Sequence, residues 1–306
     1  MKLLLYLFLS IIPPQDSLKL MFWNVENFFD YHDGGANASD AEFSSRGPRH
    51  WTKKRFKAKC DAVSKTVLAA ADRYGGLPDV VGLAEVENAF VLRRLLEETS
   101  LRKTDYAYVH FDSPDPRGID VALLWRKSQL KLIEARPYGI EGLATRDILG
   151  ACFKDAQGDS VAVFICHLPS KYSGAASEGR RVRAVSRLVQ VSDSLRAAGW
   201  TRQVVVGDFN DVVSSGTFSP LKRRFRNLSE GLEPGTIRFS GVWETIDQAW
   251  AGGGFAAGSY AGVCDFPFLT TEDKSYGGVK PLRTYSGPAY QGGVSDHYPI
   301  FLVLIL

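Results

Sequence analysis

The stretch LKLMFWNV, residues 18–25, carries the pattern that recurs along the whole chain. It is apolar and aromatic with partial alternation, which is typical of a buried β-strand. Two pairs of similar runs flank short polar turns and predict hairpins. Beyond this first strand, strands are predicted at residues 79–84, 106–111, 119–125, 148–153, 160–166, 203–206, 236–243, 246–250 and 300–306.

Helices are predicted between these strands. Apolar stripes at helical spacing cover residues 53–74, 89–98 and 180–196. Polar and Gly-rich stretches predict loops at residues 33–47, 251–263 and 271–293. Hairpins and strand–helix units alternate without a break in composition, so we expect residues 17–306 to form a single α/β domain with mixed sheets.

Composition excludes several classes of protein. The 306 residues are 45% hydrophobic and 23% charged, which rules out disorder, collagen-like repeats and a coiled coil. The net charge of +3 rules out a histone-like or polybasic membrane binder. The four cysteines lie far apart without a Cys-x-x-Cys pair, which removes zinc-ribbon and thioredoxin motifs and leaves a disulfide open.

The first 16 residues resemble a targeting segment. Lys2 precedes an apolar run at residues 3–12, and two prolines and polar residues follow. These ten residues, apolar except for Ser10, make a helix of roughly 15 Å, about half the thickness of a bilayer core. Residues 1–16 are therefore predicted to be a signal peptide, and the protein is expected to be exported to the periplasm or secreted. No other apolar stretch reaches transmembrane length.

Polar residues at the ends of the predicted strands are the candidate functional groups. One such residue commonly caps a turn, but five strand ends of this kind predict a site in an α/β scaffold. The residues at these ends are Asn24, Glu26, Glu85, His167, Asp208, Asn210, Asp296 and His297.

The available side chains limit the chemistry of that site. The sequence lacks His-Glu-x-x-His, Gly-x-Ser-x-Gly, Gly-x-x-x-x-Gly-Lys and a Gly-x-Gly-x-x-Gly on a strand–helix turn. Zinc hydrolases, serine hydrolases, P-loop enzymes and dinucleotide-binding enzymes are therefore disfavoured. Carboxylate and amide oxygens remain, and these hard ligands suit Mg²⁺ or Mn²⁺, which most often acts on phosphate oxygens.

Four short motifs occur in an order that resembles a known superfamily. They are WNVEN at residues 23–27, LAEV at 83–86, GDFN at 207–210 and SDH at 295–297. Together they resemble the endonuclease/exonuclease/phosphatase superfamily over residues 19–306. The resemblance implies a four-layer α/β sandwich, in which two stacked mixed β-sheets are flanked by helices and carry one site at their edge.

The resemblance also implies a role for each matching residue. Glu85 corresponds to the principal Mg²⁺ ligand, with Mn²⁺ or Ca²⁺ as alternatives, and further metal-binding positions are Asn24, Glu26 and Asp296. Asp208 and Asn210 correspond to the pair that orients or deprotonates the attacking water. The imidazole positions are His297, with Asp247 as its carboxylate partner, and His167, which matches the deoxyribonuclease and sphingomyelinase branches.

Elementary chemistry supports such a set. Phosphodiester hydrolysis needs an activated water, neutralised phosphoryl oxygens and a proton for the leaving oxygen. A carboxylate-bound imidazole keeps one tautomer and a raised pKa, and a second imidazole can act as general acid near neutral pH. Additional phosphate-binding candidates are Arg117, Ser170 and Lys171.

The sequence thus predicts a metal-dependent phosphoric ester hydrolase. The first hypothesis is a phosphodiesterase, most simply a nuclease acting on DNA or RNA as a monomer without a protein partner. The alternatives are a phosphomonoesterase or lipid phosphodiesterase for an inositol phosphate, sugar phosphate or sphingomyelin-like substrate, and a non-catalytic binding protein. Sequence alone leaves open the substrate, the endo or exo mode, and whether His297 or Asp208 is the base.

Overall fold

Strand β1 (Ser17–Phe28) lies near the middle of the first of two large sheets. The computed structural model describes residues 17–32, 34, 38–171 and 175–306, so the predicted signal peptide at residues 1–16 lies outside the described residues. β1 pairs parallel to β2 and antiparallel to β18, with Ser17 opposite Ile305. The strands of this sheet, in spatial order, are β13 (Tyr260–Val263), β18 (Ile300–Ile305), β1, β2 (Val80–Val86), β4 (Asp120–Arg126) and β3 (Tyr106–His110).

The second sheet also contains six strands and stacks on the first. β7 and β8 run parallel, and the other neighbouring pairs are antiparallel. Leu20 and Phe22 of β1 face the core between the sheets, together with Val163 and Ile165 of β7. The strands, in spatial order, are β5 (Lys131–Tyr138), β6 (Ile148–Lys154), β7 (Ser160–His167), β8 (Gln203–Asp208), β12 (Asp247–Gly252) and β9 (Arg226–Asn227).

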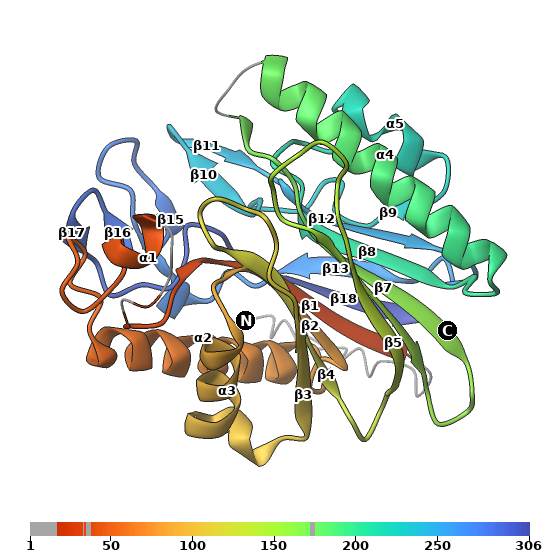
Figure 1. Cartoon of the computed structure of the whole chain (residues 1–306), viewed down its shortest axis with the longest axis horizontal. Coiled ribbons are helices and arrows are strands. Elements are labelled where there is room, and N and C mark those ends of the chain that lie inside the picture. Colours follow the sequence, from red (N-terminus) through yellow and green to blue (C-terminus); the bar gives the residue numbers. More distant parts are fainter. Residues whose placement is uncertain (1–16, 33, 35–37, 172–174) are drawn as a thin grey trace, which may run out of the picture.

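Helices cover the outer face of each sheet, which gives four layers (Figure 1). α2 (Lys53–Arg73) and α3 (Ala89–Glu98) pack on the first sheet, while α4 (Ala175–Ala197) and α5 (Ser219–Lys222) pack on the second. Because both faces of each sheet are buried, the central strands are nearly continuous apolar runs. The predicted four-layer sandwich is confirmed.

Small elements complete the fold. Three hairpins gather at one end of the sandwich (Figure 1). They are β10 (Ile237–Phe239) with β11 (Val242–Glu244), β14 (Thr270–Glu272) with β15 (Val279–Pro281), and β16 (Tyr285–Ser286) with β17 (Ala289–Tyr290). The short helices are α1 (Ala38–Glu42) and the 3₁₀ turns η1 (Ser100–Lys103), η3 (Gly216–Phe218) and η4 (Pro267–Leu269).

The structure differs from the prediction in three respects. Strand β5 was not predicted, because its exposed polar positions hide the apolar pattern of a strand at the sheet edge. Residues 236–243 form a hairpin and not one strand, because Ser240 and Gly241 take φ of 48° and 81° and reverse the chain. The loops predicted at 33–47, 251–263 and 271–293 contain α1, β13 and the paired strands β14 to β17.

Two further properties bear on the sequence predictions. All four cysteines are buried free thiols, so the structure contains no disulfide between them. Among the described residues, none of the helices has the length and apolar character needed to cross a membrane.

Candidate active site

The candidate residues meet at one edge of the stacked sheets. Parallel β1 and β2 bring Asn24 and Glu85 to this edge, and parallel β7 and β8 bring His167 and Asp208 there. The antiparallel strand β12 begins at Asp247, directly opposite Asp208. Asp296 and His297 lie just before β18, which runs antiparallel to β1. Strands β1, β2, β7 and β8 therefore end at this edge, whereas the antiparallel strands β12 and β18 begin there.

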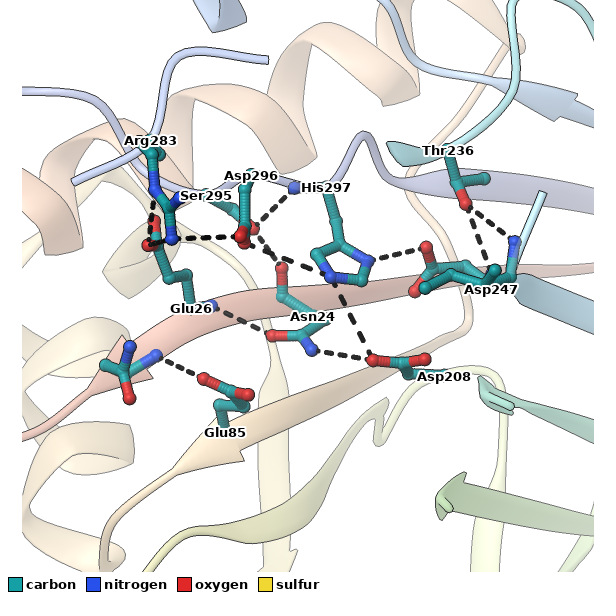
Figure 2. Close-up of polar contacts among 12 residues, drawn as sticks. Asn24, Glu26, Glu85, Asp208, Thr236, Asp247, Arg283, Ser295, Asp296 and His297 are labelled. Carbon is teal, nitrogen blue, oxygen red and sulfur yellow. Dashed lines mark hydrogen bonds and ion pairs between the residues drawn. The ribbon is translucent and has the colours of Figure 1, made fainter. Parts of the chain in front are cut away.

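One hydrogen bond joins the two sheets at this edge (Figure 2). Asn24 Nδ2 donates to Asp208 Oδ2 at 3.0 Å, and both side chains are buried. Asp208 Oδ1 accepts a hydrogen bond from the Asn210 backbone at 2.9 Å. Burial raises the pKa of Asp208 to about 7, and the charge of Asp247 adds to this effect, while His297 opposes it. The contact explains how residues from separate sheets form one site.

His297 is held by partners on several sides. Its Nδ1 lies 2.7 Å from Asp247 Oδ2, and its backbone N–H donates to Ser295 Oγ at 3.0 Å. Ser295 Oγ also donates to the Asn24 carbonyl, which ties this loop to β1. The opposite ring nitrogen, Nε2, lies 3.9 Å from both Asp208 Oδ2 and Asp296 Oδ1. The ring therefore has one fixed nitrogen and one that faces the carboxylates of the site.

The two imidazoles have opposite electrostatic environments. Burial by itself would lower the pKa of His297, but the charge and hydrogen bond of Asp247, followed by Asp208 and Asp296, raise it well above its ordinary value. For His167, burial and the positive charges of Arg146, Arg117 and His297 lower the pKa well below its ordinary value. His297 is thus favoured as a cation and His167 as a neutral ring, in contrast to the expectation that the second imidazole is protonated near neutral pH.

The predicted metal-binding carboxylates lie around the end of β1. Glu85 Oε2 accepts a hydrogen bond from the Asn27 backbone at 2.7 Å and lies 3.4 Å from Arg117 Nη2. Glu26 Oε1 pairs with Arg283 Nη2 at 2.8 Å, and that guanidinium also lies 3.1 Å from Asp296 Oδ2. Figure 2 shows Glu26 turned toward Arg283 and away from Glu85. Arg283 thus links two of the predicted ligands.

Oxygen donors of the kind that Mg²⁺ prefers lie at this edge, namely Glu85, Asp296 and the amide oxygen of Asn24. Their role as the residues that would hold the ion stays a prediction. Glu26 already has both carboxylate oxygens engaged, by Arg283 and by the Thr284 backbone. Burial raises the pKa of Glu26 to about 7, with a further contribution from the charge of Asp296.

Backbone strain is concentrated in these motifs. Six residues other than glycine have positive φ in the described part of the chain, and four of them are Glu26, Asn27, Glu85 and Asn210, with φ between 47° and 65°. The β1–β2 and β2–β4 registers shift at the same places. Conformations of this kind cost about 1–3 kcal/mol each and cluster at functional sites. Bulges in β1 and β2 therefore aim the carboxylates toward the sheet edge.

The three predicted phosphate-binding residues differ in placement. Arg117 contacts Glu85 and donates to Asn27 Oδ1 at 2.9 Å, so it belongs to the site, and its side chain remains 44% exposed. Lys171 instead pairs with Asp211 and Glu244, each at 3.3 Å. Ser170 is half-buried and follows the His167 strand.

Two cations of the site were not among the predicted residues. Arg283 lies in a segment that was predicted as loop. Lys59 is buried, and its Nζ donates to the Glu26 carbonyl and to Thr284 Oγ1. Burial lowers the pKa of Lys59 to about 8. A signal existed for Lys59, because it lies on the apolar stripe of α2 between Phe56 and Val63.

Comparisons with known proteins agree with this architecture. The sequence profile of the Endonuclease/Exonuclease/phosphatase family matches residues 19–224 and 233–305. A comparison with curated proteins found no match. Fold, site and profile define a metal-dependent phosphoester hydrolase. The chain belongs to the Endonuclease/Exonuclease/phosphatase family.

Solved structures of low sequence identity share the fold. Truncated TDP2 from Caenorhabditis elegans has a TM-score of 0.62 at 14% identity, covering 95% of this chain and 98% of that chain. The mannosyl-6-phosphatase of Bacteroides thetaiotaomicron has a TM-score of 0.61 at 16% identity, covering 94% and 100%. The human Nocturnin catalytic domain with bound sulfate has a TM-score of 0.59 at 15% identity, covering 96% and 99%.

Proposed function

We propose that the protein is a Mg²⁺-dependent phosphodiester hydrolase that acts on nucleic acid. The observation that carries this proposal is a strip of positive charge beside the site. Residues 43–60 contain seven Lys or Arg and no Asp or Glu, and the acidic residues just outside this range, Glu42 and Asp61, pair with Arg49 and Lys57. We call the exposed and half-exposed members of this group the cationic strip: Arg46, Arg49, Lys53, Lys54, Arg55 and Lys57.

The cationic strip is continuous with the loop that carries Arg283. The Arg55 guanidinium lies 4.3 Å from the ring centre of Tyr290, and that of Arg49 lies 5.2 Å from the ring centre of Tyr285. Tyr285 also donates its hydroxyl hydrogen to the Arg49 carbonyl. The rings hold the guanidinium groups in place, since Tyr285 is buried and Tyr290 half-buried. A row of positioned cations suits a polyanion, and a single small phosphate ester needs no such strip.

The residues of the site account for the steps of hydrolysis. Bound Mg²⁺ would neutralise the phosphoryl oxygens. His297, fixed at Nδ1 by Asp247, presents Nε2 toward Asp208 and Asp296, where it can hold a proton against a phosphoryl oxygen. Asp208, oriented by Asn24, is placed to accept a proton from the attacking water. Arg117 and Arg283 add positive charge at the entrance.

A phosphomonoesterase is the second candidate. The observation that favours it is the pair of half-exposed guanidinium groups on either side of the carboxylates. The side chains of Arg117 and Arg283 are 44% and 47% exposed and can grip a dianionic phosphate in two places.

The purified protein is tested on four substrates. Plasmid DNA, RNA, bis-p-nitrophenyl phosphate and p-nitrophenyl phosphate are incubated with Mg²⁺ or with chelator. We expect cleavage of nucleic acid and of the diester with Mg²⁺, and loss of at least about 100-fold in Glu85→Gln and His297→Ala. His32→Gln, at a histidine whose side chain is 53% exposed, is the matched control. Activity on the monoester alone would support the second candidate, and full activity in chelator would contradict both.

We further propose that the protein is exported. The support is the sequence of residues 1–16, with its basic start, apolar centre and polar end. Fractionation of an expressing bacterium, followed by N-terminal sequencing, should find the protein outside the cytoplasm without this segment. Retention of the intact N-terminus in the cytoplasm would contradict export.

A further inference from the structure

A second group of possible metal ligands lies next to the active site and is separate from the residues assigned to it. It consists of His110 at the end of β3, Asp112 in the following loop and Asp120 at the start of β4. One ligand atom from each residue lies within 4.8 Å of those of the other two. We call these three residues the β3–β4 cluster.

The His110 ring is buried without a partner for one nitrogen. Its side chain is 4% exposed, and among the described residues no group forms a hydrogen bond with Nε2. The facing atom is Asp120 Oδ2 at 3.7 Å, too far for a hydrogen bond. Two ligands of a tetrahedral Zn²⁺, bound at about 2.0–2.2 Å, lie about 3.4 Å apart. The gap is thus close to the span across a bound ion.

Asp120 is the buried carboxylate that faces this nitrogen. Its side chain is 6% exposed, and within the described residues its ion-pair partner is His110 alone. Its other oxygen accepts a hydrogen bond from the Ser113 backbone at 3.0 Å. Burial raises the pKa of Asp120 to about 7 and lowers the pKa of His110. A buried carboxylate that faces a buried ring nitrogen is stabilised when a cation lies between them.

The third member can close the site from solvent. Asp112 is 91% exposed, and its Oδ1 lies 3.9 Å from the other ring nitrogen, Nδ1. It would reach an ion bound at Nε2 after a rotation of its side chain, which needs no change in the core. One imidazole and two carboxylates form a mixed nitrogen and oxygen set that suits Zn²⁺ and related transition metals better than Mg²⁺.

We propose that the β3–β4 cluster binds a divalent transition metal ion of the Zn²⁺ class. The ion would join the two ends of the loop at residues 111–119, which carries Arg117 to Glu85. The same loop is fixed at its middle by the buried pair Asp115 and Arg146. The proposed ion is therefore structural and sets the position of a guanidinium group in the active site.

The test is a metal titration of the full-length protein. Protein stripped with chelator is titrated with Co²⁺ in excess Mg²⁺, and binding is followed by visible absorption and calorimetry. We expect one Co²⁺ per chain with the bands of a four-coordinate site, displaced by Zn²⁺. His110→Gln and Asp112→Asn should each weaken binding at least about 10-fold. Because Asp112 is exposed, Asp112→Asn should leave the metal-free Tm unchanged.

Matched controls separate this cluster from the catalytic residues. His50→Gln makes the same substitution at an exposed histidine and should bind Co²⁺ like the wild type. His297→Ala should also retain the binding. No Co²⁺ uptake by the wild type in Mg²⁺, equal affinity in His110→Gln, or loss of binding in His297→Ala alone would each overturn the proposal.

Discussion

At the scale of single residues, the carboxylate behind His297 has a positioning role. Asp247 is almost fully buried and holds Nδ1 of the ring, so Asp247→Asn can reverse the proton arrangement of this hydrogen bond without changing the side-chain volume. We expect kcat to fall about 100-fold or more, with a smaller change in KM. Steady-state kinetics on the diester substrate measures this. Unchanged kcat in a folded variant would show that the pair is dispensable.

The buried His167 ring should make the stability of the folded protein depend on pH. Its pKa is lowered in the folded state by burial and by the cations Arg146, Arg117 and His297, while Asp208 faces it at 3.5 Å. The stabilising effect of the neutral ring is complete above the unfolded pKa of about 6.5 and is lost as the pH falls below it. Because the folded pKa lies well below the unfolded one, each pH unit below about 6.5 removes up to about 1.4 kcal/mol of stability.

The measurement compares the free energies of unfolding of the wild type and His167→Asn between about pH 6.5 and pH 5. The wild type should lose more stability than the variant over this range, by up to about 1.4 kcal/mol per pH unit. Parallel curves for the two proteins would contradict a lowered pKa at His167.

At the scale of elements, the loop between β3 and β4 depends on one buried ion pair. Arg146 Nη1 and Asp115 Oδ2 lie 2.8 Å apart with side chains 8% and 4% exposed, and Arg146 also donates to the Leu168 carbonyl. Removing one partner leaves the other charge buried, so Arg146→Met should cost about 3–5 kcal/mol of stability. The double variant Arg146→Met with Asp115→Leu should recover part of it. Urea unfolding of the set tests this, and additive losses would contradict coupling.

Secondary structure could be predicted wherever the apolar pattern was strong. The helix at residues 89–98 was predicted with its exact bounds, because Asn88 caps its first turn and its apolar face is continuous. Strand β5 was missed because it alternates exposed and half-buried positions at an edge. The small strands of residues 270–290 were missed because their pairing is set by tertiary contacts and not by local propensity.

At the scale of the whole molecule, the cationic strip predicts how substrate length matters. Lys53, Lys54 and Lys57 are exposed on the first turns of α2, and reversing all three charges should weaken nucleic-acid binding and reduce its dependence on salt concentration. KM on DNA should rise at least about 10-fold at low salt, while hydrolysis of bis-p-nitrophenyl phosphate should be unchanged.

The control reverses exposed cations on the opposite outer layer. Arg183, Lys222 and Arg223 lie on or next to α4 and α5, and their reversal should leave KM on DNA within about twofold of the wild type. Equal effects of the two triple variants would indicate a response to net charge alone and would contradict a binding role for the strip.

Not every residue of the site could be predicted from the sequence. Most residues of the site were predicted from their position at the ends of predicted strands, and Asp247 from the family resemblance. In the structure they lie at or near the ends or starts of strands that share one edge: Asn24, Glu85, His167, Asp208, Asp247, Asp296 and His297. Arg283 and Lys59 come from an irregular loop and from a helix face. Their positions beside Glu26 depend on how the segment around residues 283–284 packs against α2. No local sequence pattern encodes this packing.

The pairing of Ser17 with Ile305 places the two ends of the described fold side by side, at the end of β1 remote from Asn24. A short Gly/Ser bridge could therefore join these ends, and the chain could be reopened at the exposed turn of residues 155–158 between β6 and β7. Such a circular permutant should keep its hydrolytic activity, because neither the bridge nor the new opening touches a strand end that carries a site residue. Its kcat, compared with that of the parent protein, shows whether the active site can form when the segments follow one another in a different order.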